Sequence, residues 1–341
     1  MNVLVTGIDG YIGSVLGPTL IQENFNVIGL DTGYYRNGWL HNSGFLQFPA
    51  VVNKDIRHIN ELDLYKIDAV IHLAELSNDP LGQLNQNITF KINHLGTVLL
   101  AQKCKELGIN RFIYTSSCSV YGKGNDDFKT EMSETNPQTA YAKCKVMVEQ
   151  DLQKLADQNF SPVFLRNATA YGVSPRMRFD LVLNNLAGLA WTIKQIRLIS
   201  DGFPWRPLVH VSDICQAITC ALKAPKELIH NQIFNVGDSN ENFRVREIAE
   251  IVAQTFPSCE LIVGKNDGDN RSYRVSFDKI NSQLPGFKCN MNIKKGAQEL
   301  QDIFKKIDMK KDTFEFRAFT RVEQIKYLLK SKQIDKNLFW I

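Results

Sequence analysis

The sequence predicts an α/β protein in which a doubly wound parallel sheet carries a smaller, partly interleaved lid. Two observations lead to this prediction. Strand-like and helix-like segments alternate through the first half of the chain, and this alternation requires a parallel sheet with helices on both faces. The chain also has 341 residues with 44% hydrophobic content, which is enough to bury a large core.

The expected elements of the first half are short apolar strands, most of them followed by a segment with apolar residues at helical spacing. In a sheet of this kind, ligands bind at the carboxyl ends of the strands. The expected strands are residues 2–6, 26–30, 49–53, 68–74, 111–117 and 161–167, and the expected helices are residues 11–22, 59–65, 85–107 and 139–156.

The regular alternation of strand-like and helix-like segments ends after Tyr171, where a helix-like segment is followed by short strands and further helices. We interpret this half as a lid over the ligand edge of the sheet. No internal repeat or low-complexity linker separates the two halves. The expected division is a sheet domain over residues 1–170, with a later contribution from about 207–236, and a lid mainly over residues 171–341.

Three glycines, Gly7, Gly10 and Gly13, lie between the first strand and the first helix. They could mark a plain turn, or be a chance spacing in a chain with 21 glycines. Their place between a buried strand and a helix favours a third interpretation. Glycine lets the backbone turn tightly and lets a pyrophosphate approach the helix N-terminus, whose free N–H groups and dipole attract anions.

Asp31 follows the second strand, eighteen residues after Gly13. A dinucleotide-binding fold places there the carboxylate that accepts hydrogen bonds from the adenosine ribose hydroxyls. The same carboxylate would repel the additional phosphate of NADP, so the sequence favours NAD. The alternative is that Asp31 only caps a turn.

Composition argues against several classes of protein. The net charge is +4 with both signs interspersed, and the Lys305–Lys311 cluster is typical of a solvated surface, so no nucleic-acid partner is expected. The seven cysteines are scattered without a CxxC pair, which indicates reduced thiols in the cytoplasm and no metal site. No apolar run is long enough to span a bilayer, so no membrane partner is expected.

Tyr141 and Lys145 lie four residues apart on an expected helix and therefore project from one face. Tyrosine is a poor base because its ordinary pKa is about 10. An ammonium about 4 Å away, at an effective dielectric constant near 20, is worth about 4 kcal/mol and would bring that pKa toward neutrality. Any helix can carry Y-x-x-x-K by chance. Ser117 weakens this alternative, because it ends an apolar strand and could hydrogen-bond the substrate oxygen that Tyr141 deprotonates.

These motifs together resemble the extended short-chain dehydrogenase/reductase family, in particular its NAD-dependent sugar-nucleotide epimerases and dehydratases. The similarity extends over most of the chain, because residues 205–214 and 233–252 also resemble the second half of that family. It implies a Rossmann-type sheet domain that binds NAD and a lid that binds the substrate. The motifs are TGIDGYIG, Asp31, DIR at residues 55–57, HLA at residues 72–74, SSCSVYG, and Tyr141-x-x-x-Lys145.

The resemblance implies a role for each matching residue. Tyr141 would be the catalytic base, Lys145 its electrostatic partner and a ligand of the nicotinamide ribose, and Ser117 the second hydroxyl at the substrate. The other residues implied in cofactor binding are Gly7, Gly10, Tyr11, Ile12, Gly13, Asp31, Asp55, Ile56, Leu73, Ala74 and Asn93. The residues implied in substrate binding are Ser117, Cys118, Thr169, Asn185, Arg206 and Arg271, with Asn185 and Arg206 at the nucleotide diphosphate.

Two departures from the family pattern matter for function. Dehydratases of the family follow the catalytic hydroxyl with Asp-Glu, whereas this chain has Cys118-Ser119, so simple dehydration is disfavoured. Thr169 stands where many sugar-nucleotide enzymes carry an asparagine near the substrate phosphates. Cys118 itself is either a small buried residue beside the sheet or an acid–base group at the sugar.

The expected function is that of an NAD-dependent sugar-nucleotide epimerase that passes through a transient keto-sugar. The alternatives are a net NAD(P)-dependent reductase or dehydrogenase, a dehydratase and, in another class, a catalytically silent dinucleotide-binding sensor. A homodimer formed by the helices over residues 85–107 and 139–156 is also expected, although both helices could simply pack on their own sheet. The apolar residues expected at the dimer interface are Ile88, Ile92, Leu95, Leu99, Val146, Val148 and Leu152.

Overall fold

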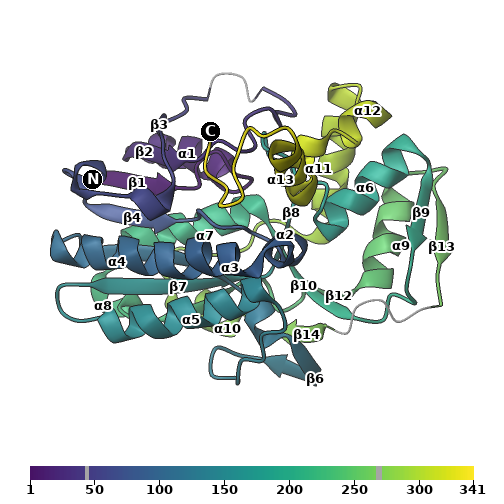
Figure 1. Ribbon diagram of the computed structural model, residues 1–341. Coiled ribbons are helices and arrows are strands. Elements are labelled where there is room, and N and C mark those ends of the chain that lie inside the picture. The colour runs from purple at the N-terminus through teal and green to yellow at the C-terminus, as the bar shows by residue number, and fades with distance from the viewer. Residues whose placement is uncertain (43–45, 266–270) are drawn as a thin grey trace.

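The computed structural model describes residues 1–42, 46–265 and 271–341 (Figure 1). At its centre, parallel strands form a seven-stranded sheet in the order β3-β2-β1-β4-β5-β7-β11. The strand order reverses between β1 and β4, as in a doubly wound sheet, and the predicted fold class is confirmed. The strands are β1 (Asn2–Thr6), β2 (Asn26–Asp31), β3 (Ala50–Asn53), β4 (Ala69–His72), β5 (Arg111–Ser117), β7 (Ser161–Asn167) and β11 (Ile233–Val236).

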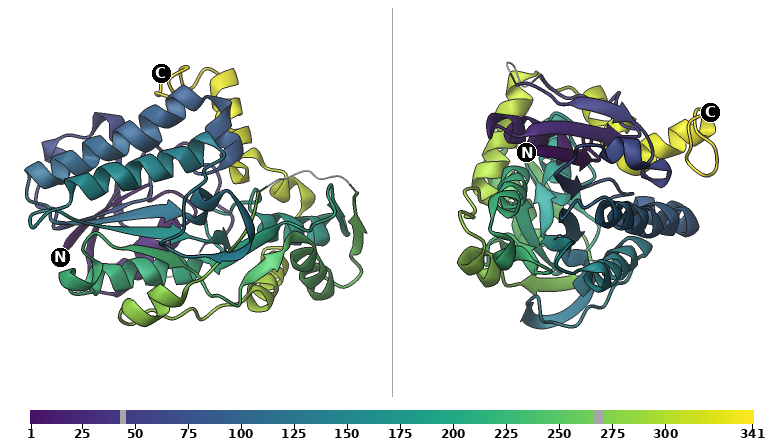
Figure 2. Two further views of the ribbon diagram at one scale, coloured as in Figure 1. Left: turned by 90° about the horizontal axis from the view of Figure 1, so that it is seen from below. Right: turned by 90° about the vertical axis from the view of Figure 1, so that its left-hand side faces the viewer.

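Helices cover both faces of this sheet. On one face lie α1 (Gly13–Gln22) and α7 (Val211–Lys223), and on the other α4 (Thr97–Glu106) and α5 (Ala140–Leu155) lie side by side (Figure 2). Leu4 in β1 points to the core under α4 and α5, whereas its two neighbours point to the core under α1. Because both faces of the sheet are buried, the sequences of its strands are continuous apolar runs.

Two expected helices have a different form in the structure. The segment expected to be helical over residues 59–65 contains only a short 3-10 turn, preceded by another. The long helix expected over residues 85–107 is interrupted by a π-helical stretch, a rare form that is frequent at functional sites. The observed elements are the 3-10 turns Ile56–His58 and Glu61–Leu64, then α3 (Gln86–Thr89), the π-helical stretch Phe90–Gly96, and α4.

The lid consists of small sheets and helices that Figure 1 shows gathered at one end of the central sheet. Its strands are β8 (Thr169–Tyr171), β10 (Trp205–His210) and β12 (Asn242–Arg244), then β9 (Gln195–Leu198) with β13 (Glu260–Val263), and β14 (Ser272–Val275), which pairs with β6 (Lys123–Lys129). The remaining α-helices of the described residues are α2 (Asp79–Leu84), α6 (Val182–Thr192), α8 (Lys226–Ile229), α9 (Val245–Thr255), α10 (Asp278–Gln283), α11 (Ile293–Lys306), α12 (Lys311–Phe314) and α13 (Arg321–Lys330).

The C-terminal helix α13 packs on the core of the sheet domain. Ile325 in α13 is buried in the same core as Leu30 and Ile56. The Tyr34 hydroxyl, in the loop after β2, donates a hydrogen bond to the carbonyl of Leu338. The chain therefore ends against the loop that follows Asp31, a contact that the division at residue 170 did not anticipate.

The helices expected to form a homodimer bury most of their named apolar residues in their own chain. Ile88, Ile92, Val148 and Leu152 are all buried in the core under α4 and α5. Leu95, by contrast, is 57% exposed. These four residues therefore pack within their own chain, as the alternative to a dimer interface expects. The homodimer stays a prediction.

Candidate active site

A cavity of about 430 Å³ lies where the carboxyl ends of the central strands meet the lid. It collects side chains from both halves of the chain, because the ends of parallel strands share one edge of a sheet. Of the expected site residues, its lining includes Gly7, Gly10, Tyr11, Ile12, Gly13, Asp31, Asp55, Ile56, Leu73, Ala74, Ser117, Tyr141, Lys145, Thr169, Arg206 and Arg271.

The glycine turn between β1 and α1 is too tightly packed for side chains. Gly7 has a φ of +75°, and a Cβ added there would lie 2.7 Å from the backbone nitrogen of Ala74. A Cβ on Gly13 would lie 2.5 Å from the carbonyl oxygen of Gly7. Glycine is therefore required for the turn to close, and the cavity reaches the N-terminus of α1 without an intervening side chain. This shape suits a diphosphate at the end of the helix dipole.

Asp31 both holds a turn and lines the cavity. One of its carboxylate oxygens accepts a hydrogen bond from the backbone N–H of Gly33 at 2.7 Å, and the other accepts from that of Asp9 at 3.1 Å. Burial, followed by the nearby Asp9 charge, raises the pKa of Asp31 to about 6, although the two backbone hydrogen bonds oppose this shift. The carboxyl group is therefore mainly ionised at neutral pH and can accept hydrogen bonds from ribose hydroxyls.

We expect Asp31→Ala to weaken NAD binding by about 10- to 100-fold, because a hydrogen bond to a charged group is worth about 1.5–3 kcal/mol. NADP binding should weaken less, since the same change removes a charge that repels its additional phosphate. Titration calorimetry with both dinucleotides measures the two affinities. Tighter binding of NADP than of NAD by the unmodified protein would contradict this assignment.

The control is Asp31→Asn, which keeps one acceptor oxygen but loses the charge. Because the pKa of Asp31 is about 6, the NAD affinity of the unmodified protein should fall as the pH is lowered through 6. Asp31→Asn should lack this fall, since it has no carboxyl group to protonate.

Tyr141 and Ser117 face the cavity from neighbouring elements. Tyr141 lies in the first turn of α5, whose N-terminus is capped by the side chain of Thr139, and Ser117 is the last residue of β5. The Ser117 hydroxyl lies close enough to Tyr141 to lower the pKa of its phenol. Lys145 lies one turn further along α5 and is 3% exposed. The three residues therefore meet at one wall of the cavity.

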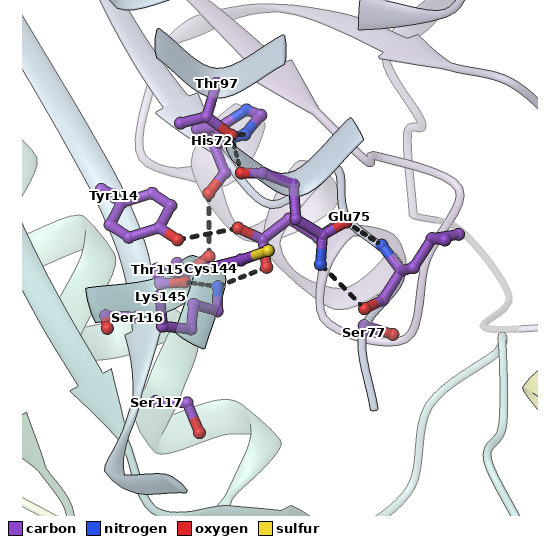
Figure 3. Close-up of polar contacts among 12 residues, drawn as sticks. His72, Glu75, Ser77, Thr97, Tyr114, Thr115, Ser116, Ser117, Cys144 and Lys145 are labelled. Carbon is purple, nitrogen blue, oxygen red and sulfur yellow. Dashed lines mark hydrogen bonds and ion pairs between the residues drawn. The ribbon is translucent and has the colours of Figure 1, made fainter. Parts of the chain in front are cut away.

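Lys145 is not free to act on Tyr141 alone, because Glu75 neutralises its charge. The Lys145 Nζ lies 2.6 Å from the Glu75 carboxylate (Figure 3). It lies 5.4 Å from the centre of the Tyr141 ring. Burial and then the Glu75 charge raise the pKa of Tyr141 above its ordinary value, although the Ser117 hydrogen bond and the Arg178 charge lower it. The surrounding protein groups therefore raise the pKa of Tyr141, and its role as the catalytic base stays a prediction.

Three expected site residues are absent from the described lining of the cavity. Asn93 is fully buried, and its side chain amide exchanges two hydrogen bonds with the backbone of Leu76, so it holds the loop after β4. The side chain amide of Asn185 donates to the carbonyl of Phe179 at 2.9 Å. Cys118 is 1% exposed, and burial raises the pKa of its thiol. It therefore matches the interpretation as a small buried residue beside the sheet.

The expected lid arginines lie together at the cavity. Arg206 donates through its guanidinium to the backbone carbonyl of Arg271 at 2.5 Å, and Arg271 forms an ion pair with Asp79. Tyr11 also lines the cavity, but its hydroxyl donates to the carbonyl of Gly172 at 2.7 Å. Tyr11 therefore ties the glycine turn to the lid.

Several lining residues carry charges that the sequence analysis missed. Glu75 directly follows the HLA motif at the end of β4, and its position after a buried strand was a usable signal. Arg178 and Asp180 form an ion pair at 2.8 Å from a segment expected to be a plain helix. Arg321, in α13, places its guanidinium 4.0 Å from the Tyr35 ring centre, and no local pattern indicated this contact.

Two absences concern only the part of the chain that the structure describes, residues 1–42, 46–265 and 271–341. Among these residues, no helix has both the length and the apolar character needed to cross a membrane. Nor does this part of the chain bring together three or more His, Cys, Asp or Glu side chains that could hold a metal ion.

The doubly wound sheet, the glycine turn with Asp31, and the Tyr141, Lys145 and Ser117 wall define an enzyme of the extended short-chain dehydrogenase/reductase type. Residues 3–237 match the NAD dependent epimerase/dehydratase family, and the chain belongs to that family. Its cofactor is NAD, and the described cavity fits this group through the glycine turn and the Asp31 carboxylate.

Curated relatives with both chemistries of the family resemble the chain at low identity. A UDP-glucuronate 4-epimerase of Thermodesulfobacterium geofontis is 25% identical over 275 residues, which are 77% of this chain and 80% of that protein. A dTDP-D-glucose 4,6-dehydratase of Homo sapiens is 26% identical over 298 residues, which are 82% of this chain and 83% of that protein. These relatives place the chain among sugar-nucleotide enzymes without separating epimerase from dehydratase.

Solved structures share the fold. An NAD-dependent NDP-hexosamine 5,6-dehydratase aligns with a TM-score of 0.79 at 21% identity, covering 90% of this chain and 99% of that one. A UDP-glucuronic acid 4-epimerase from Bacillus cereus, in complex with UDP-glucuronic acid and NAD, aligns with a TM-score of 0.78 at 22% identity, covering 90% of this chain and 100% of that one.

Proposed function

We propose that this enzyme is a sugar-nucleotide epimerase that acts through a transient keto-sugar. One observation favours epimerisation over dehydration. The position after Ser117 holds Cys118, whose thiol is buried and donates to the carbonyl of Arg166 at 3.2 Å. Ser119, which follows, has no carboxyl group. The acid and base that the family's dehydratases carry at these two positions are therefore missing.

Four of the five carboxylates that line the described cavity form ion pairs, and the fifth, Asp31, accepts hydrogen bonds from backbone N–H groups at the expected ribose site. The pairs are Glu75 with Lys145, Asp79 with Arg271, Asp180 with Arg178 at 2.8 Å, and Asp55 with Arg57 at 2.7 Å. Removing a sugar hydroxyl as water requires a free acid for the leaving group and a free base for the C–H proton. These pairings favour a reaction that needs proton transfer at one oxygen only.

In the proposed reaction, Tyr141 removes the proton of a sugar hydroxyl and later returns it to the same oxygen. Bound NAD supplies the hydride chemistry at the attached carbon. Ser117 hydrogen-bonds the same oxygen and keeps it within reach of Tyr141. If the sugar turns in the cavity between the two proton transfers, the hydroxyl re-forms with the opposite configuration.

We also propose which residues hold the two ligands. The glycine turn would bind the dinucleotide diphosphate, Asp31 the adenosine ribose, and Asp55 and Ile56 the adenine. Arg206 and Arg271 would bind the diphosphate of a nucleotide sugar, for which a planar guanidinium is well suited. The UDP- and dTDP-sugars in the names of the curated relatives support this substrate class.

Turnover in D₂O tests the proposal. Purified protein is incubated with a panel of nucleotide sugars, and the products are identified by NMR. We expect an inverted sugar without deuterium on its carbon skeleton, because Tyr141 exchanges only the hydroxyl proton with solvent. A dehydratase would incorporate deuterium at a carbon next to the ketone. A lasting change in nicotinamide absorbance, in proportion to product, would instead identify a net reductase or dehydrogenase.

A further inference from the structure

The 334–341 segment, which follows α13, lies against residues that line the cavity. In Figure 1 it is the yellow loop that ends at the label C. The Trp340 indole N–H donates to the backbone carbonyl of Thr32 at 2.7 Å. The Tyr34 hydroxyl donates to the carbonyl of Leu338. Because Thr32 and Tyr34 both line the cavity, the segment is bound to the cavity wall itself.

A second hollow, of about 300 Å³, adjoins the cavity on the side of this segment. The two spaces have four lining residues in common, which are Thr32, Tyr34, Lys54 and Asp55. Three residues of the 334–341 segment also line the hollow, namely Leu338, Phe339 and Trp340. Asp55, the residue proposed to bind the adenine of NAD, therefore lies where the cavity meets the segment.

The Asp55 carboxylate is held by a chain of contacts that begins in the segment. Its two oxygens accept hydrogen bonds from the Arg57 guanidinium, at 2.7 Å from Nη2 and at 2.9 Å from Nε. The third nitrogen, Nη1, donates to the carbonyl of Asn337 at 2.8 Å. The guanidinium carbon lies 3.8 Å from the centre of the Phe339 ring, on which the His58 ring also stacks. Phe339 therefore holds the guanidinium that holds Asp55.

The backbone of the segment takes a costly conformation to make these contacts. Leu338 has a φ of +64°, in the left-handed region that residues other than glycine rarely adopt. On its two sides, Tyr34 donates to its carbonyl and the Asp335 carboxylate accepts from the N–H of Phe339 at 2.8 Å. Such a conformation persists only where surrounding contacts hold it, and strained residues of this kind cluster at ligand sites.

We propose that the 334–341 segment belongs to the NAD site, and that Phe339 and Arg57 are positioning residues that orient the Asp55 carboxylate toward the amino group of adenine. This inference rests on the proposed role of Asp55 and not on the sugar chemistry. The adenine amino group donates hydrogen bonds and a carboxylate accepts them. A carboxylate that is fixed before binding loses less conformational freedom when adenine arrives, so the bond contributes more to affinity.

The test uses two dinucleotides that differ at one position of the base. NAD carries the amino group, whereas nicotinamide hypoxanthine dinucleotide has a carbonyl oxygen there, which a carboxylate repels. The full chain is loaded with either dinucleotide in labelled form, and its release into excess unlabelled NAD is followed. The ratio of the two release rates then measures how well Asp55 reads the amino group, because affinity differences between related ligands are mostly differences in dissociation rate.

The substitution is Phe339→Ala, and the matched control is Tyr327→Ala. Tyr327, in α13, also has a guanidinium over its ring, that of Arg317 at 3.7 Å from the ring centre. Tyr327 lines neither the described cavity nor the hollow. Both substitutions thus remove an aromatic ring beside an arginine in the last part of the chain, and only one of these arginines holds Asp55.

We expect the unmodified protein to release the hypoxanthine dinucleotide about 10- to 100-fold faster than NAD, the usual effect of one hydrogen bond to a charged group. In Phe339→Ala the release of NAD should become about tenfold faster and that of the hypoxanthine dinucleotide should change little, so the ratio falls. Tyr327→Ala should keep the ratio of the unmodified protein. An unchanged ratio in Phe339→Ala, equal acceleration of both dinucleotides, or the same fall in both variants would overturn the proposal.

A double-mutant cycle tests whether Phe339 acts through Arg57. Arg57→Met should lower the ratio as Phe339→Ala does, and adding Phe339→Ala to Arg57→Met should change it little further, because the two residues form one chain of contacts. Independent, additive effects would contradict this route. Phe339→Leu keeps the apolar bulk and removes only the flat ring, so it gives the same test if Phe339→Ala does not fold.

The release rates separate this inference from the proposed reaction. If no nucleotide sugar is converted by the unmodified protein, the proposed function fails, while the dinucleotide ratio still decides the role of the segment. If the unmodified protein releases the two dinucleotides equally fast, Asp55 does not read the amino group and the proposal is overturned.

Discussion

Replacing Tyr141 by phenylalanine is expected to lower turnover by about 10²- to 10⁴-fold, the usual range for the loss of a general base. The substitution removes the phenol hydroxyl and preserves the ring that packs beside Lys145. NAD and the nucleotide sugar should therefore still bind. Steady-state kinetics with any confirmed substrate, together with calorimetry for binding, separates the two effects.

Tyr121→Phe is the matched control for Tyr141→Phe. The Tyr121 hydroxyl is also buried, and it donates to the side chain of Asn235 at 2.7 Å, but Tyr121 does not line the described cavity. Its loss should affect stability and leave turnover nearly unchanged. Raising the pH should not restore Tyr141→Phe, which has no proton to lose. Near-normal turnover in Tyr141→Phe would show that the proposed mechanism is wrong.

Replacing Lys145 by alanine is expected to lower the free energy of unfolding by about 3–5 kcal/mol, in addition to its effect on catalysis. The substitution leaves the Glu75 carboxylate buried without its counter-charge. Burial already raises the pKa of Glu75, while Lys145 opposes this shift, so the pKa must rise further when Lys145 is lost. Urea unfolding of the unmodified protein and the variant measures the difference.

The pH dependence and a second substitution identify the cause of this destabilisation. A carboxyl group with a folded-state pKa above its unfolded value destabilises the protein more as the pH rises, until the folded-state pKa is passed. Lys145→Ala should therefore be less destabilised near pH 5 than near pH 8. Adding Glu75→Gln to Lys145→Ala should recover part of the lost stability. If the double variant were less stable than Lys145→Ala, the buried charge would not be the cause.

Short-range sequence patterns predicted many residues of the candidate site. Gly7 and Gly13 lie in one turn, and Tyr141 and Lys145 lie one helical turn apart, so chain geometry alone brings each pair together. Ser117 joins them because the carboxyl ends of parallel strands share an edge. The fold class follows from the same local information, since strand and helix periods alternate along the chain.

Short-range sequence patterns could not predict the direction of side chains or the contacts between distant segments. Asn93, Cys118 and Asn185 all belong to segments near the cavity, yet each side chain bonds to backbone elsewhere. Whether a side chain faces a ligand or the core depends on the packing of neighbouring elements. Arg321 reaches the cavity because α13 returns to the sheet domain, a path that no local pattern specifies.

The sequence by itself determined the class of fold, the cofactor and the hydroxyl–phenol–amine set of the active site, because each depends on residues close together in the chain or on the order of its elements. The tertiary structure decided the electrostatic state of that set. Glu75 and Lys145 are far apart in sequence, and only the folding of β4 against β5 and α5 places their charges 2.6 Å apart. Since a charge acts through space and not along the chain, its effect on Tyr141 becomes readable only when the distances are known.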